Sequence, residues 1–278
     1  MDRIAPGHHL YPGPDGNWRH SAPDGRFTRI RGPRELLSTA QRDAYGAAGP
    51  SAADSAGRDD ALALRTALRE RGVLVAEGDL RSHGATAAAG TALGNVHVEG
   101  DNPVAHAVAA LLPPAVRVTT GRLDENAVRA ADTVISCAGW LPDAHWRNVD
   151  EWCARHSTSW HRCHAEGLRF VVGPMYVPGH TVGYADTRGR LLAAADLPDE
   201  LAAHWAYLDG DVLPPVPWPG PGVTAVLAGL LVGDLLHQRD TGVPAARDVQ
   251  LVVDPATLAT DRHQVLPLPV TAHAGAAR

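Results

Sequence analysis

Two short stretches of the chain hold residue types that could do chemistry, and one is the run HRCH at positions 161–164. Imidazole nitrogens and thiolate sulfurs are the ligands that zinc and related metals prefer. The surrounding pattern predicts a strand, on which His161 and Cys163 share one face while His164 points to the other. Three such neighbours cannot all reach one ion, so the sequence predicts no metal site here.

The other stretch is the loop after residues 73–76, which we expect to form the first strand of an alternating strand–helix region. A nucleotide-binding sheet carries G-x-G-x-x-G in this loop, where main-chain amides and a helix N-terminus hold the phosphates. Here Gly78 and Gly84 are the only glycines, and their spacing is wrong. Glu77 and Asp79 also put carboxylates where they would repel phosphates. The sequence therefore predicts a degenerate loop and no bound cofactor.

Two kinds of enzyme stay open as alternatives. An ATP-dependent adenylating enzyme would need arginines at the phosphates, because the chain has no Lys, and the candidates are Arg81 and Arg117. A nicotinamide oxidoreductase would use an acid for the ribose, and Glu99 or Asp101 follows the loop at about the required 20 residues. The chain has neither a G-x-S-x-G elbow nor an H-E-x-x-H run, so no residue is assigned a catalytic role.

Composition limits the class of protein. The 278 residues are 45% hydrophobic, enough for one large domain or two small ones, and the formal charge of −6 argues against nucleic-acid binding. No apolar run reaches the roughly 18 residues of a membrane span, and the start MDRIAPGHHL lacks the layout of a signal peptide. The three cysteines form no C-x-x-C pair, which suits a reducing compartment. We expect a cytoplasmic protein with no nucleic-acid or membrane partner.

The first 72 residues are predicted to form a separate module. Turns rich in proline and glycine separate three short strands, after which the pattern becomes helical. The expected strands are 8–11, 18–21 and 26–31, and the expected helices are 34–45 and 61–71. Gly72 then ends the second helix. Three strands followed by helices predict a winged-helix-like module.

From residue 73 onward, strands and helices alternate, which is typical of a Rossmann-like α/β sheet with helices on both faces. Strands are expected at 73–76, 96–98, 116–119 and 133–137, and helices at 103–112, 124–131, 143–156, 197–208 and 223–238. Residues 160–165 and 168–177 should form an antiparallel pair, and 249–253 a C-terminal hairpin with 260–265. The last residues, 272–278, are expected to be disordered.

The segment LRFVVGPMYVPGHTVGYADTRGR, residues 168–190, resembles part of a known family. Its V-G-P-x-x-x-P-G run is similar to that of the ThiF-like, E1-like partner proteins of YcaO enzymes, which act in azoline-forming, thiopeptide-type peptide biosynthesis. The ending HQVLPLP resembles the closing R-H-x-V-x-P-H-P phrase of that family. Where the family carries a C-x-x-C zinc pair, this chain has Gly183, Tyr184, Ala185 and Asp186. The resemblance implies an E1-like scaffold that has lost its zinc and nucleotide sites.

The first module in turn resembles the PqqD-like recognition element at the front of many proteins that modify ribosomally made peptides. In that family an extended leader peptide adds a strand beside the third strand, and the last helix walls the groove. Projected here, the resemblance places the peptide at Phe27, Thr28, Arg29, Ile30 and Arg31 of the strand and at Leu62, Arg65, Thr66 and Arg69 of the helix. The alternative is a small winged helix with solvated arginines, and the net charge disfavours DNA binding.

These observations predict a recognition element at 1–72, a ThiF/E1-like Rossmann-type domain at 73–271 and a tail at 272–278. The expected function is that of a non-catalytic adaptor. It would bind the leader of a ribosomal precursor peptide and present the core to a YcaO cyclodehydratase or another tailoring enzyme. Pairing with a second copy is compatible with this function. The adenylating enzyme and the nicotinamide-dependent enzyme remain the alternatives.

Overall fold

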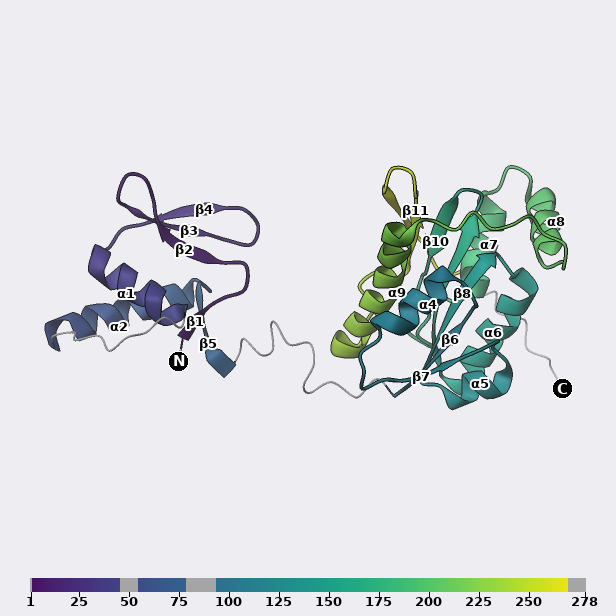
Figure 1. The fold of residues 1–278 in the computed structure, drawn as a ribbon, viewed down its shortest axis with the longest axis horizontal. Helices are drawn as coiled ribbons and strands as arrows, with labels where there is room; N and C mark the ends of the chain where they lie inside the picture. Colours follow the sequence, from purple (N-terminus) through teal and green to yellow (C-terminus); the bar gives the residue numbers. More distant parts are fainter. Residues whose placement is uncertain (1, 46–54, 79–93, 270–278) are drawn as a thin grey trace. The chain divides into compact units, whose positions relative to one another are not determined.

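The computed structural model describes residues 2–45, 55–78 and 94–269, without the side chains of 55–58. The tail expected at 272–278 lies outside these residues. The chain divides into two compact units, Met1–Ala89 and Gly90–Arg278, each with its own sheets and buried core (Figure 1). No helix in the described ranges is long and apolar enough to cross a membrane.

The first unit is built on a three-stranded antiparallel sheet with the order β2-β3-β4. Its elements are β1 (Asp2–Ile4), β2 (His9–Pro12), β3 (Trp18–Ser21), β4 (Phe27–Ile30), α1 (Arg34–Ala44), α2 (Ser55–Glu70) and β5 (Leu74–Ala76). The three predicted strands and two predicted helices are confirmed, although α2 begins earlier than its pattern indicates. Leu10, Trp18 and Ile30, one from each strand, are buried together with the apolar side of α1.

The strand β5 lies in the first unit, and the prediction that it opens the large sheet is wrong. It pairs antiparallel with β1, with Leu74 opposite Ile4. Val73 and Leu74 are buried in the same core as Leu68 of α2. A short apolar run shows that a strand is buried but does not identify its partner strand. The large sheet therefore begins with the next strand, and the boundary expected after residue 72 falls too early.

The second unit contains a seven-stranded mixed sheet in the order β12-β11-β10-β9-β8-β6-β7. Its strands are β6 (Asn95–Glu99), β7 (Arg117–Thr120), β8 (Thr133–Trp140), β9 (Ser159–Glu166), β10 (Arg169–Val172), β11 (Val249–Val253) and β12 (Thr260–Gln264). Strands β6 to β9 are parallel, and β9 to β12 form antiparallel neighbours. The predicted antiparallel pair and the predicted C-terminal hairpin are both confirmed.

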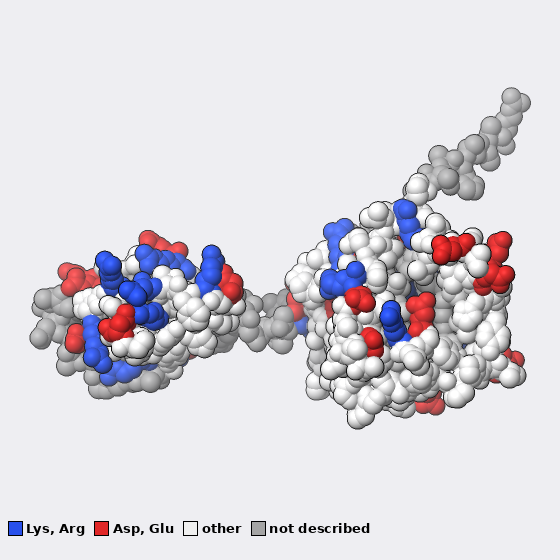
Figure 2. Space-filling view, turned by 90° about the horizontal axis from the view of Figure 1, so that it is seen from above, with Lys and Arg blue, Asp and Glu red and all other residues white. Residues whose placement is uncertain are grey.

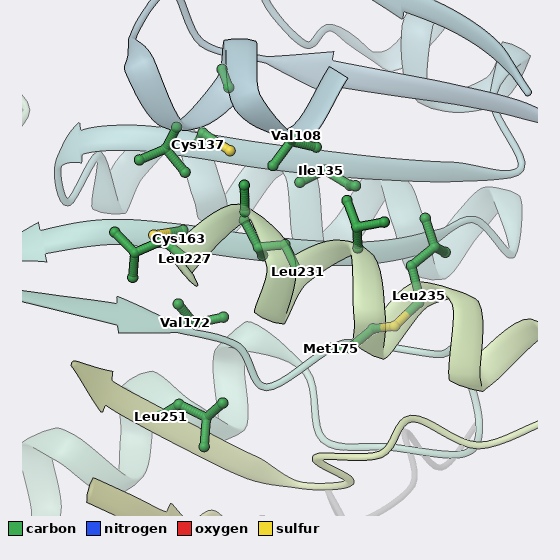
Figure 3. Packing of buried hydrophobic residues seen from close by; sticks show 14 of the residues in the cluster. Val108, Ile135, Cys137, Cys163, Val172, Met175, Leu227, Leu231, Leu235 and Leu251 are labelled. Atoms are coloured by element: carbon green, nitrogen blue, oxygen red, sulfur yellow. The ribbon is translucent and has the colours of Figure 1, made fainter. Parts of the chain in front are cut away.

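Helices cover both faces of this sheet, as the alternating pattern predicts (Figure 1). They are α4 (Pro103–Leu111), α5 (Glu125–Ala130), α6 (Asp143–His156), α7 (Tyr184–Ala194), α8 (Pro198–Leu208) and α9 (Pro221–Thr241). On one face, Leu227, Leu231 and Leu235 of α9 pack against the strands together with residues of α4 (Figure 3). On the other face, Trp146 of α6 and Trp205 of α8 share a second buried cluster.

The V-G-P segment turns the chain back without forming a regular second strand. Gly173 has a φ of 72°, which glycine adopts without steric cost. Tyr176 alone returns to the sheet, where its N–H donates to the Trp160 carbonyl at 2.7 Å. Helix α7 follows, and the sequence pattern does not predict this element.

Candidate functional site

In the described part of the chain, strand β4 is an outer edge of its sheet and pairs only with β3. Where this hairpin closes, the Ala22 N–H donates to the Arg26 carbonyl at 2.9 Å. Hydrogen-bonded and non-bonded pairs alternate in an antiparallel ladder, so Thr28 and Ile30 also turn their main-chain groups toward β3. The residues between them turn their N–H and C=O groups outward, where a further strand can pair.

These outward positions are Phe27 and Arg29, and their side chains are exposed as well. Phe27 is 71% exposed, the Arg29 side chain is 59% exposed, and Thr28 and Arg31 are exposed too. Figure 2 shows arginines gathered on the visible face of this unit. Ile30 differs, because its side chain is buried in the core of the unit. The strand residues predicted from the sequence thus lie on one open edge, except for the side chain of Ile30.

The helix residues predicted from the sequence divide into two pairs. Arg65 forms an ion pair with Asp43 of α1, and Arg69 donates to a carboxylate of β1 at 2.8 to 3.0 Å. Leu62 is 61% exposed, and Thr66 is also exposed. The two arginines therefore fasten α2 to α1 and β1, which their helical spacing alone does not reveal. Leu62 and Thr66 remain exposed on α2.

In the second unit, the carboxyl ends of β6, β7 and β8 meet where the strand order reverses. The chain passes from β6 to β7 on one side and then crosses to β8 on the other side of β6. Crevices at such a switch point hold the ligands of open α/β sheets. A cavity of 440 Å³ lies beside this point, between the carboxyl ends of β6 and β7 and the helix α4. It is lined by Val98, Glu99, Gly100, Asp101, Ala105, His106, Ala109, Thr120, Gly121 and Arg122.

The sequence pattern places the nucleotide loop one strand too early. Gly78 follows β5 in the first unit, and Asp79, Arg81 and Gly84 lie outside the described residues. The loop after the first parallel strand is instead the run GDN at 100–102, which is followed by Pro103, the first residue of α4. A capping asparagine followed by proline, as at 102–103, marks a helix start and was the signal available in the sequence.

The first turn of α4 begins at this crevice, but its amides are already occupied. The Asn102 side-chain oxygen accepts from the N–H groups of Val104 and Ala105, both at 3.1 Å. Pro103 has no N–H to offer. The Asn102 side-chain nitrogen donates to the main-chain oxygen of Cys137 at 2.7 Å. The helix start therefore lacks the free donors that hold phosphate in nucleotide-binding sheets.

A carboxylate lies in the same crevice. Glu99 accepts from the Leu123 N–H at 2.9 Å and hydrogen-bonds with His145 Nε2 at 2.8 Å. Burial raises the pKa of Glu99, but the hydrogen bonds, that of His145 foremost, outweigh burial and hold the pKa below its usual 4.5. The ionised group would repel a phosphate. Arg122 lines this cavity, whereas Arg117 begins β7 and so lies at the opposite end of the parallel strands.

At the positions where the resemblance places a zinc pair, carboxylates hold the start of a helix. Asp150 of α6 accepts from the N–H groups of Tyr184 and Ala185, the first residues of α7, at 2.8 and 3.0 Å. Asp186 accepts from the Leu268 N–H of the C-terminal segment at 2.7 Å. These contacts fasten α7 both to α6 and to the C-terminal segment.

The HRCH run lies on β9, and its side chains separate to the two faces as predicted. Cys163 belongs to the core beneath α9, where His161 Nε2 lies 3.3 Å from Asp234 Oδ2. His164 lies on the other face and packs edge-on against Trp146, with 5.3 Å between ring centres. Within the described residues, no three His, Cys, Asp or Glu side chains are close enough to hold a metal ion.

No family model and no curated protein matches this chain, whereas solved structures do. A heterocyclase in complex with substrate and cofactor gives a TM-score of 0.65 at 12% identity, over 96% of this chain and 38% of that one. The heterocyclase TruD gives 0.64 at 13% identity, over 96% and 42%. MccB from E. coli with AMPCPP and MccA gives 0.58 at 12% identity, over 97% and 98%.

The chain thus spans about two fifths of the length of these heterocyclases and nearly all of MccB, which is a biosynthetic enzyme of Microcin C7. At these identities the likeness shows the fold alone. The predicted α/β class is confirmed, and the fold of this chain is similar to the folds of these heterocyclases and of MccB.

Proposed function

We propose that this chain is a non-catalytic partner protein that binds the leader of a ribosomally made precursor peptide. It would present the core of that precursor to a YcaO cyclodehydratase or another tailoring enzyme. The open edge of β4 carries the proposal, because Phe27 and Arg29 offer outward main-chain groups to an added strand. Binding the leader raises the effective concentration of the core at a distant active site without any chemistry in this chain.

The fold likeness supports the same kind of process. MccB has been solved with MccA, and a heterocyclase of similar fold with its substrate. By this analogy the first unit serves as a PqqD-like recognition element and the second as a ThiF/E1-like scaffold. The second unit would then act as a platform for the tailoring enzyme or for a second copy of the chain.

The switch-point crevice supports a role without nucleotide chemistry. The side chain of Asn102 occupies the amides of the first turn of α4, and the carboxylate of Glu99 adds a negative charge beside them. Phosphate binding there would have to overcome both the missing donors and the repulsion. In this proposal the second unit keeps the α/β fold, and the occupied amides together with Glu99 disfavour phosphate binding.

The leader segment that suits β4 is extended and carries acidic side chains. Arg29 lies 3.6 Å from Asp15, a loose ion pair at an exposed site, and such pairs contribute little. Arg31 forms no ion pair within the described residues. Carboxylates on alternate residues of an added strand can therefore reach both arginines.

The experiment that tests this proposal compares Arg29→Pro with Arg29→Ala. Labelled leader peptides encoded beside this gene are titrated with the full chain and followed by fluorescence polarisation. Proline removes the outward N–H of residue 29 and leaves the pairing with β3 intact, whereas alanine removes only the side chain. We expect the proline variant to bind at least about tenfold more weakly than the alanine variant.

Two outcomes would contradict the proposal. Equal affinities of the two variants, with unchanged circular dichroism, would mean that the leader does not add to this edge. Failure of the wild-type chain to bind any of the encoded leaders would remove the adaptor function altogether.

The alternative is an ATP-dependent adenylating enzyme, and the 440 Å³ cavity at the switch point is the observation that favours it. MccB from E. coli has been solved with AMPCPP. In this chain Arg122 would have to meet the phosphates in spite of Glu99. A pyrophosphate-exchange signal that Arg122→Ala abolishes would establish this activity, and the adaptor gives no such signal. No contact among the described residues favours a nicotinamide-dependent enzyme.

A further inference from the structure

The second unit has another cavity, 220 Å³ in volume, which shares no lining residue with the switch-point crevice. It lies between the carboxyl ends of β8 and β9 and the helix α8. Its walls include Trp140, His164, Leu201, Trp205, Tyr207 and Leu208. Apolar pockets with a few polar groups are the usual form of a small-ligand site.

Two aromatic side chains of the lining, Trp140 and Trp205, are each held by a contact with another residue. Trp140 Nε1 donates to the main-chain oxygen of Pro214 at 2.8 Å. Trp205 is 4% exposed, and the Arg188 guanidinium lies 5.1 Å from the centre of its ring. Walls held in this way present flat apolar surfaces, which suit a planar ligand.

His164 is the buried ionisable side chain of the cavity lining, and it makes no hydrogen bond with any described residue. It is 8% exposed and packs edge-on against Trp146. Its ring nitrogens are not among the fully buried unpaired atoms, so they keep some exposure and are available to a ligand. Burial, and then the nearby charge of Arg162, lower the pKa of His164 to about 3. The imidazole is therefore neutral at pH 7 and offers one donor and one acceptor.

The volume limits the ligand to one ring system. An engineered apolar cavity of about 150 Å³ takes up benzene, so 220 Å³ leaves room for one substituted ring. A charged group would be costly to bury in these walls, and the carboxylate of Glu166 at the exposed rim repels anions. We propose that this cavity binds an uncharged aromatic ring carrying one hydrogen-bonding group, such as a phenol or an indole, with that group bonded to His164.

Within the proposed function, this ring is a tyrosine or tryptophan side chain of the precursor peptide. That assignment rests on the proposed function, whereas the ring preference of the cavity does not. The cavity would then select precursors by one aromatic residue, in addition to the strand edge that binds the leader.

Titration of the full wild-type chain with p-cresol, toluene and 4-methylbenzoate tests the cavity, with binding followed by ligand-detected NMR. p-Cresol is expected to bind roughly fivefold to tenfold more tightly than toluene, which is the effect of one net hydrogen bond. 4-Methylbenzoate should bind more weakly than both because of its charge. Equal affinities for p-cresol and toluene would overturn the proposal, and this comparison needs no variant.

Variants locate the site. His164→Phe should reduce the affinity for p-cresol to that for toluene, and Leu208→Trp, which fills the cavity, should weaken the binding of both. Val212→Ala is the control, since Val212 is 89% exposed and does not line the cavity. Binding of p-cresol that survives both cavity variants would place the ligand elsewhere and overturn the proposal.

A competition experiment separates the cavity from the precursor. N-acetyltyrosinamide should displace p-cresol, and N-acetylphenylalaninamide should do so less well. If p-cresol binds as expected and neither amide displaces it, the proposal that the cavity binds a phenol-like ring is supported. The proposal that this ring is a side chain of the precursor peptide is then wrong.

Discussion

The side-chain amide of Asn102 donates a hydrogen bond of 2.7 Å to the main-chain oxygen of Cys137, and so joins the start of α4 to β8 across the switch point. Both groups are buried. Gly100 allows this close approach, because a Cβ there would lie 2.3 Å from the same oxygen. One asparagine thus caps the helix and closes the site where this type of sheet holds phosphate.

Asn102→Ala is expected to destabilise the chain by about 2–4 kcal/mol. It removes a helix cap, worth about 1 kcal/mol, and leaves the buried oxygen of Cys137 without its partner, which costs about 1–3 kcal/mol. Urea denaturation measures the loss. Asn126→Ala is the control, because Asn126 is exposed and bonds only to Arg129. Similar losses in the two variants would mean that the bond to Cys137 contributes nothing.

Proline at adjacent positions of β4 should give opposite results in stability. Thr28 turns its N–H to β3, so Thr28→Pro removes a ladder hydrogen bond and should clearly lower the melting temperature. Arg29 turns its N–H outward, so Arg29→Pro should be close to neutral. Thermal denaturation by circular dichroism compares the two. A greater loss in Arg29→Pro would mean that the outward main-chain groups are assigned to the wrong residues.

Asp150→Ala should destabilise the chain by about 1–2 kcal/mol, because two amides at the start of α7 lose their acceptor. Asp150→Asn should cost less, since the amide oxygen of asparagine still accepts. Glu151→Ala, on an exposed position of the same helix, should change stability by no more than about 0.5 kcal/mol. The three variants are compared by urea denaturation, and equal stability of Ala and Asn at position 150 would contradict the capping role.

His164 should make the chain less stable as the pH falls below 6.5. Its pKa lies near 3 in the folded chain and at 6.5 ordinarily, so the unfolded chain takes up a proton in this window and the folded chain does not. Stability therefore decreases by up to about 1.4 kcal/mol per pH unit from this group. The difference in unfolding free energy between the wild type and His164→Phe, measured from pH 7 to pH 4, should change with that slope. A difference that is constant with pH would show that the pKa of His164 is the same in the folded and the unfolded chain.

Chelation should leave the melting temperature unchanged, and added zinc should not raise it. A ligand that binds only the folded state raises stability in proportion to the logarithm of its concentration. The start of α7 is held by Asp150 and Asp186 through hydrogen bonds and needs no metal. Differential scanning fluorimetry with EDTA and with ZnCl₂ measures both effects. A zinc-dependent rise would reveal a metal site that these carboxylate contacts do not explain.

Much of the secondary structure can be predicted from local sequence patterns. The turns before Trp18 and Phe27, the alternation of strands and helices after residue 94 and the closing hairpin all follow from short-range periodicity and from proline and glycine positions. The separation of Cys163 from His164 also follows, because a strand alternates its faces. These features depend on neighbours along the chain, so one sequence suffices to predict them.

The strand pairing, the ion pairs and the cavities depend on residues that are far apart along the chain. The sequence alone determined that 74–76 is a strand, but only the tertiary structure paired it with β1 and moved the switch point to the loop at Gly100. Its burial is limited to Leu74, because Val75 is half-buried and Ala76 is exposed. The commitment of Arg65 to Asp43, and the cavity around His164, likewise arise from elements that meet in space. Periodicity reports which side of an element is buried, whereas the choice of partner depends on the packing of the whole chain.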